Sequence, residues 1–334
     1  MSKTVQNSLL TLVVCLIVAY GFAFMATDGQ PVSYFLTERE SPEDLKETFD
    51  LPDPVFVALT KNWLTGEKDI EDLRRVFFSY TLLLTKIDMA TGNSPQAKQA
   101  KRQAIIALQK GQFEQAEKNL EEAAQIDLNK GQDYWLAASE TYGLMAGVVL
   151  LFGDYEQAAQ YYEQAAQTIV TIAPDQAGVY LVNQAKQLDE ANLLSQTIMV
   201  HEKAVSLFEK ELEADHPYML MTLNNMANYY RRAKMYDQAE ELFLRVIKYG
   251  EAKLSPEHSN LGVWYNNIAM TYSGNNKPKK AEEFFRKSLI LFENILGKES
   301  AYTKSTANNF MRFLFQYDRS AEAEEIRRTY MEHQ

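Results

Sequence analysis

The sequence has a single cysteine, Cys15, and few residues that break helices. One cysteine excludes a disulfide framework, a cysteine-rich zinc site and a CxxC redox pair. Only 14 glycines and 9 prolines occur in 334 residues, below the usual fractions of about 7% and 5%. The 34 basic residues are outnumbered by 45 acidic ones, and the net charge of −11 argues against binding to nucleic acid through its phosphates. The composition therefore favours helices joined by short links.

Residues for catalysis or metal binding are also scarce. There are 4 histidines. His201-Glu202 begins like a zinc-protease HExxH motif, but Val205 stands where the second histidine is needed. Gly297-Lys298 resembles the end of a phosphate loop, yet Phe292 replaces the leading glycine. No GxSxG motif and no Cys–His nucleophile pair occur. We therefore predict a protein that is not an enzyme, with no cofactor, no metal and no small-molecule substrate.

An uncharged stretch lies near the N-terminus. Residues 4–27 carry no charge and residues 9–26 are almost wholly apolar, which as a helix gives a length of about 27 Å, enough to cross a bilayer core. Lys3 precedes the stretch and Asp28 follows it. Residues 1–29 are therefore predicted to be a signal anchor with a cytoplasmic N-terminus, which would place the remaining chain on the periplasmic or another non-cytoplasmic side. The alternative is a signal peptide cleaved near Gly21-Phe22-Ala23.

Residues 30–96 are predicted to form a helical junction and N-terminal cap. Four prolines keep the first helices of this segment short. From residue 69 to residue 90, apolar side chains recur every three to four positions and describe one face of a helix. We expect this helix to pack over the start of the domain that follows.

A repeat of forty-two residues organises the rest of the chain. Paired asparagines occur at 224/225, 266/267 and 308/309. Alanines recur at the same step in two series, which are Ala116 and Ala158 and then Ala239, Ala281 and Ala323. The unit between the two series is irregular, with a shorter step of thirty-nine and Thr197 where the alanine is expected. Each unit is predicted to form two amphipathic helices joined by a tight turn, and a helical pair of this kind must stack on the next one to bury its faces.

This pattern resembles the tetratricopeptide repeat. Small residues stand at positions eight and twenty of a unit (Ala227 and Ala239, then Ala269 and Ala281), with aromatic residues at positions eleven and twenty-four (Tyr230 and Phe243, then Tyr272 and Phe285). The period resembles the longer repeats of kinesin light chains, whose links tend to carry the Asp-His-Pro found at 215–217. The resemblance implies an all-α, right-handed superhelical solenoid at 97–334, with about six units that start near 97, 139, 178, 220, 262 and 304 and are preceded by the predicted transmembrane helix. His216 and His258, which recur in the links, are expected to make capping hydrogen bonds.

The resemblance also implies a concave groove lined by the first helices, into which the sixth position of a unit points. Four successive units carry an amide there: Asn183, Asn225, Asn267 and Asn309. An amide can pair with both the N–H and the C=O of an extended chain. Neighbouring side chains are predicted to supply specificity: Lys186, Asn228, Arg232 and Arg312. The alternative is that the amides bridge adjacent helices within the protein.

The carboxylate clamp that some members of this family use to bind chaperone C-termini is not predicted. A frame that starts at the first unit supplies Lys101 but then has Ile105 and Leu144 at positions that need asparagine. A frame that starts at the fourth unit ends on Ser305 and Asn309, where cations are required. We therefore expect a different mode of ligand binding.

The favoured function is that of a membrane-anchored, non-catalytic adaptor or scaffold. It would bind an extended peptide or a segment of a partner protein in the groove and assist the assembly of a membrane or envelope complex. The alternatives are a structural protein that self-assembles through its convex face or ends, and a signal-cleaved soluble binding protein.

Overall fold

The protein is built from consecutive antiparallel helical pairs. The computed structural model describes residues 41–61, 69–214 and 216–331, and this part contains fifteen α-helices and no strand. Three helices come first: α2 Pro42–Thr48, α3 Asp53–Lys61 and α4 Ile70–Met89. The first three pairs are α5 Pro95–Gln109 with α6 Phe113–Asn129, α7 Trp135–Leu150 with α8 Tyr155–Ile169, and α9 Pro174–Glu190 with α10 Leu194–Glu211. The last three are α11 Pro217–Arg232 with α12 Tyr236–Lys253, α13 Ser259–Gly274 with α14 Pro278–Leu296, and α15 Ala301–Gln316 with α16 Ser320–Tyr330.

The predicted all-α class is confirmed, but the predicted membrane topology is not. Across residues 41–61, 69–214 and 216–331, no helix combines the length and the apolar character that a bilayer crossing requires. The transmembrane helix expected within residues 1–29 lies outside the described residues. The localisation predicted from the sequence, that of a single-pass membrane protein, is therefore contradicted.

The turn within each pair has the same backbone geometry. A residue with positive φ follows every first helix: Gly111, Gly153, Asn192, Lys234, Asn276 and Asp318. The next N–H then bonds to the carbonyl five residues back, as in Met235 N to Tyr230 O at 2.8 Å. This is the Schellman arrangement, which satisfies carbonyls left over at the end of a helix. The step between these turns is 42 residues except for 39 between Gly153 and Asn192, so the irregular unit keeps the turn.

The last three links between pairs are closed by side-chain caps. Nδ1 of His216 accepts a hydrogen bond from Tyr218 N at 3.2 Å, and Nδ1 of His258 accepts one from Asn260 N at 3.2 Å. Oγ of Ser300 likewise accepts a hydrogen bond from Tyr302 N at 3.3 Å, at the start of α15. The expectation that the recurring histidines cap helices is therefore confirmed.

Small buried residues allow the paired helices to approach each other. The repeating alanines are fully buried, at 0% exposure: Ala116, Ala158, Ala239, Ala281 and Ala323. Thr197 occupies the same place in the irregular unit and is also fully buried. Phe243 and Phe285 fill the space next to the alanines and are at most 1% exposed. The spacing seen in the sequence thus corresponds to the contact between helices.

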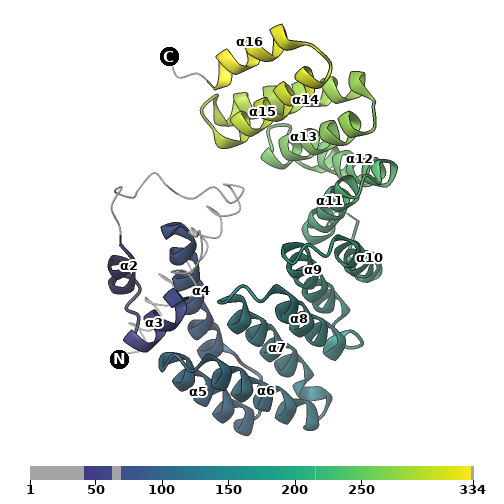
Figure 1. Ribbon diagram of the computed structural model, residues 1–334. Helices are drawn as coiled ribbons and strands as arrows, with labels where there is room; N and C mark the ends of the chain where they lie inside the picture. Colours follow the sequence, from purple (N-terminus) through teal and green to yellow (C-terminus); the bar gives the residue numbers. More distant parts are fainter. Residues whose placement is uncertain (1–40, 62–68, 215, 332–334) are drawn as a thin grey trace.

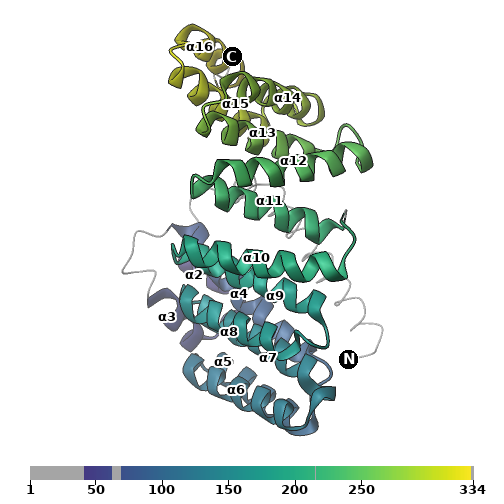
Figure 2. The ribbon, with the colours of Figure 1, turned by 90° about the vertical axis from the view of Figure 1, so that its right-hand side faces the viewer.

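Stacked pairs form a curved array, visible from two directions in Figures 1 and 2. One large hydrophobic cluster runs from Ile198 to Ala323, and another joins the first two pairs to α2, α3 and α4. Two smaller clusters around Ala185 and Ala177 lie between them, where α8 packs against the irregular third pair. The core is therefore divided near α9.

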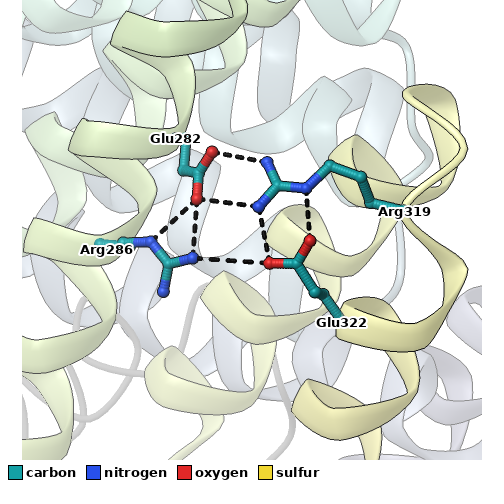
Figure 3. Close-up of polar contacts among 4 residues, drawn as sticks. All are labelled: Glu282, Arg286, Arg319 and Glu322. Carbon is teal, nitrogen blue, oxygen red and sulfur yellow. Dashed lines mark hydrogen bonds and ion pairs between the residues drawn. The ribbon is translucent and has the colours of Figure 1, made fainter.

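A network of ion pairs joins the last two pairs of helices (Figure 3). Nη1 of Arg319 donates to Glu282 at 2.5 Å, and Nε of Arg319 donates to Glu322 at 2.6 Å. Arg286 donates to the same Glu282 at 2.7 Å. The Arg319 guanidinium, together with Arg286, lowers the pKa of Glu282 to about 2. Forty-two residues earlier, the bond from Lys277 Nζ to Glu240 at 2.6 Å repeats the same contact, so the period governs charged pairs as well as the core.

Replacing Ala239 by leucine should destabilise the protein by about 1–3 kcal/mol, because the added carbons have no space at a fully buried helix crossing. Urea denaturation followed by circular dichroism measures the change. The matched control is Gln238→Leu, at an exposed neighbouring position. If Ala239→Leu unfolded at the same urea concentration as the wild type, the helix register described here would be wrong.

Candidate protein-interaction groove

The first helices of the pairs form the inner face of the curve. In Figure 1, α9 and α11 face the hollow, whereas α10 and α12 lie on the outer side. Residues on successive first helices come into register because the pairs stack with a constant step. We call the face formed by α9, α11, α13 and α15 the groove face.

The corresponding face of the first two pairs is covered by the chain itself. Helix α4 contacts α5 and α7, which are the first helices of the first two pairs. Oη of Tyr80 donates to the carbonyl of Leu108 at 3.3 Å. A Cβ added at Gly147 would lie 3.0 Å from Leu83 Cδ1, so the absence of a side chain at Gly147 allows this approach. The helix expected at residues 69–90 is thus present. Within residues 41–61, 69–214 and 216–331, α4 has no comparable contact with α9 or the later first helices.

The asparagine pairs form amide bridges between neighbouring first helices. Nδ2 of Asn267 on α13 donates to Oδ1 of Asn224 on α11 at 3.2 Å. Nδ2 of Asn309 on α15 donates to Oδ1 of Asn266 on α13, also at 3.2 Å. Oδ1 of Asn225 accepts from Asn224 at 3.3 Å. The internal bridging weighed from the sequence therefore exists for Asn267 and Asn309, and each bridge uses one of the two N–H groups of the donating amide.

The other predicted groove residues are distributed unevenly. Asn183 is half-buried and Lys186 is exposed, both on α9. Nδ2 of Asn228 bonds to the carbonyl of Asn224 at 3.2 Å. Nη1 of Arg232 on α11 forms an ion pair with Asp189 on α9 at 2.5 Å. The charge of Arg232 is therefore already used in a contact between two helices. Peptide binding by these residues remains a prediction.

A cleft of about 430 Å³ opens where α11, α13 and α15 meet. Its polar lining consists of Arg231, Ser273, Asn309, Arg312 and Gln316. Three aromatic rings and Met270 form the apolar lining. A Cβ at Gly274 would lie 2.5 Å from the ring of Tyr236, so this glycine lets the ring form one wall. The structure thus brings two of the predicted residues, Asn309 and Arg312, into one site.

Sequence reasoning missed Arg231, which lines this cleft with Arg312. A signal for it was present in the repeat. The repeat step of forty-two residues relates Asn228 to Met270 and Met270 to Arg312, and it also relates Arg231 to Ser273. Within one helix, Met270 and Ser273 are three residues apart, and residues at that spacing share one face of a helix. All of these residues except Asn228 line the cleft.

Lys101, tested above as the first residue of a carboxylate clamp, is buried. Its exposed fraction is 3%. Burial lowers the pKa of Lys101 to about 8, although Glu140 and Asp127 act in the opposite direction. A side chain in this position cannot reach a ligand on the surface, which agrees with the rejection of the clamp.

The chain belongs to the tetratricopeptide-repeat family. The family model matches residues 97–168, 190–252 and 218–294, and together these segments cover more than half of the chain. No curated protein sequence matches the chain significantly.

Solved structures share this fold at low sequence identity. BtubC (BKLC) from P. vanneervenii is 16% identical, with a TM-score of 0.52 over 69% of this chain and 86% of that one. Kinesin-light-chain TPR-like repeats from Podosopora anserina are 18% identical, with a TM-score of 0.46 over 60% of this chain and 93% of that one. A STAND protein from Pyrococcus horikoshii with a tetratricopeptide-repeat sensor has a TM-score of 0.45 at 16% identity, over 86% of this chain and 47% of that one. These likenesses concern the fold alone.

His201, the histidine of the incomplete HExxH motif, lies inside the protein beside the groove face. It is 1% exposed, and its ring lies 4.9 Å from that of Tyr229 on α11, edge to face. Among the described residues, no group of three or more His, Cys, Asp or Glu side chains is arranged to hold a metal ion. Burial lowers the pKa of His201 from 6.5 to about 4.

Acid should therefore destabilise the protein through His201. Because its pKa is lower in the folded state, the stabilisation is complete above about pH 6.5 and is lost as the pH falls towards 4. Between pH 7 and pH 4.5, we expect the wild type to lose about 2 kcal/mol more stability than His201→Leu. Urea denaturation of both proteins at each pH measures this, and carboxylates common to both cancel in the difference. Equal losses in the two proteins would show that His201 does not titrate as described.

Proposed function

We propose that this protein is a non-catalytic scaffold that holds an extended segment of a partner protein along the groove face of α11, α13 and α15. The observation that carries the proposal is the row of bridged amides, in which Asn267 is 9% exposed and Asn309 is half-buried, beside an open cleft on these helices. Tetratricopeptide repeats support a protein-interaction role. The corresponding face of the first two pairs is covered by α4, so we assign binding to the groove face of the C-terminal half.

The spacing of the amides suits an extended chain. Neighbouring helices pack about 8–10 Å apart, and an extended peptide advances about 3.3–3.6 Å per residue. One amide would therefore meet the peptide at roughly every third residue. The bridges between helices hold Asn267 and Asn309 in place before the ligand arrives, which lowers the entropic cost of binding.

The double change Asn225→Ala and Asn267→Ala tests the proposal. Peptides are first selected from a phage-displayed library of random dodecapeptides on the full-length wild type, and their affinities are measured by fluorescence anisotropy. The loss of two amide contacts should weaken binding by about tenfold or more. Alanine is a better helix former than asparagine, so helicity should be preserved.

The control is the double change Gln238→Ala and Glu241→Ala at exposed positions of α12, on the outer side. It should leave affinity unchanged. Undiminished binding to the Asn225→Ala, Asn267→Ala protein with intact helicity would reject the groove face as the binding site. A failure to select any peptide, together with oligomers in sedimentation, would instead favour self-assembly.

A further inference from the structure

The cleft between α11, α13 and α15 contains two arginines without a carboxylate partner. Among the described residues, neither Arg231 nor Arg312 forms an ion pair, whereas Arg232 and Arg245 pair with Asp189 and Glu209. In a chain with a net charge of −11, acidic side chains are abundant, yet none has been placed against this pair. The cleft is therefore a local site of positive charge in an acidic protein.

Arg231 is held in this position although it is partly buried. Its Nε is buried and has no hydrogen-bond partner within the described part of the chain. Nη2 reaches only Oδ1 of Asn228, at a long 3.4 Å. Burial and the neighbouring Arg232 lower the pKa of Arg231. A buried donor without a partner costs free energy, and a carboxylate bound to the guanidinium where it lines the cleft would offset that cost.

We propose that this cleft binds the carboxylate of an Asp or Glu side chain in the partner segment, an inference that rests on the function proposed above. A guanidinium offers parallel N–H donors that match the two oxygens of a carboxylate. The side-chain amides of Asn309 and Gln316 provide further N–H donors around the same space, whereas the hydroxyl of Ser273 donates to Oε1 of Gln316 at 3.3 Å. Tyr236, Phe285 and Phe313 also line the cleft.

The cleft is connected to the row of amides. Asn309 bridges to α13 and also lines the cleft. A main chain that is held by the amides would therefore bring one of its side chains to Arg231 and Arg312. The amides would bind any extended segment, and the two arginines would select one that carries an acidic residue at a fixed place.

The test uses two libraries of random dodecapeptides, one displayed with blocked C-termini and one with free C-termini, selected on the full-length protein. Blocked peptides should become enriched in Asp or Glu at one position. A synthetic selected peptide in which that Glu is changed to Gln should bind the wild type at least about tenfold more weakly. Enrichment only among free C-termini would show that the cleft takes a terminal carboxylate, and would overturn the assignment to a side chain.

The protein side of the test compares Arg231→Gln/Arg312→Gln with the charge-matched control Arg245→Gln/Arg328→Gln. In the first variant, Glu and Gln peptides should bind equally, whereas the control should keep the tenfold preference. Arg312→Gln alone, at an exposed position, should reduce the preference without affecting folding. A preference that survives in both double variants would overturn the inference.

The two proposals can fail separately. Selected peptides without an acidic residue that still lose affinity for the Asn225→Ala, Asn267→Ala protein would overturn the carboxylate site and leave the groove intact. If no peptide were selected from either library, the proposed function itself would be contradicted.

Discussion

A pair of short amphipathic helices cannot bury both of its faces alone, and the rest of this structure depends on that constraint. Each pair must stack on the next, and stacking requires close approach at a small residue, which is why the alanines of the series from Ala116 to Ala323 are fully buried. The turn that follows each first helix is equally constant, with a positive φ from Gly111 to Asp318. The same step that positions the core also positions the Glu240–Lys277 and Glu282–Arg319 ion pairs.

The groove face is a consequence of this regularity. Because first helices stack in register, asparagines forty-two residues apart become neighbours in space and bridge α11, α13 and α15. The cleft beside them arises from the same step of forty-two residues, since Met270 and Arg312 occupy equivalent positions in successive pairs. Departures from the period mark the limits of the face: the core is divided near the irregular third pair, and the first two pairs are covered by α4.

Much of the fold could be predicted from the sequence, because the residues that repeat with its forty-two-residue period act through local contacts. The spacing of Ala239 and Ala281 located the helix crossings, and that of His216 and His258 located the caps. The site was harder to predict because it depends on contacts between distant segments. The apolar face at residues 69–90 predicted that α4 would pack over the start of the repeats, but not that it would cover the inner face of α5 and α7. Arg231 could not be told from Arg232 until Asp189 was seen to pair with only one of them. The apolar stretch at residues 9–26 suggested a membrane protein from composition alone, and the described helices do not support that localisation.

The central claim is that partner segments lie on the groove face of the C-terminal half. Photo-crosslinking tests it most directly, with p-benzoylphenylalanine placed in turn at Met270, which lines the cleft, and at Met199, which is 57% exposed on α10. A labelled peptide selected on the wild type should crosslink at Met270 and not at Met199. Crosslinks at Met199 and none at Met270 would contradict the account.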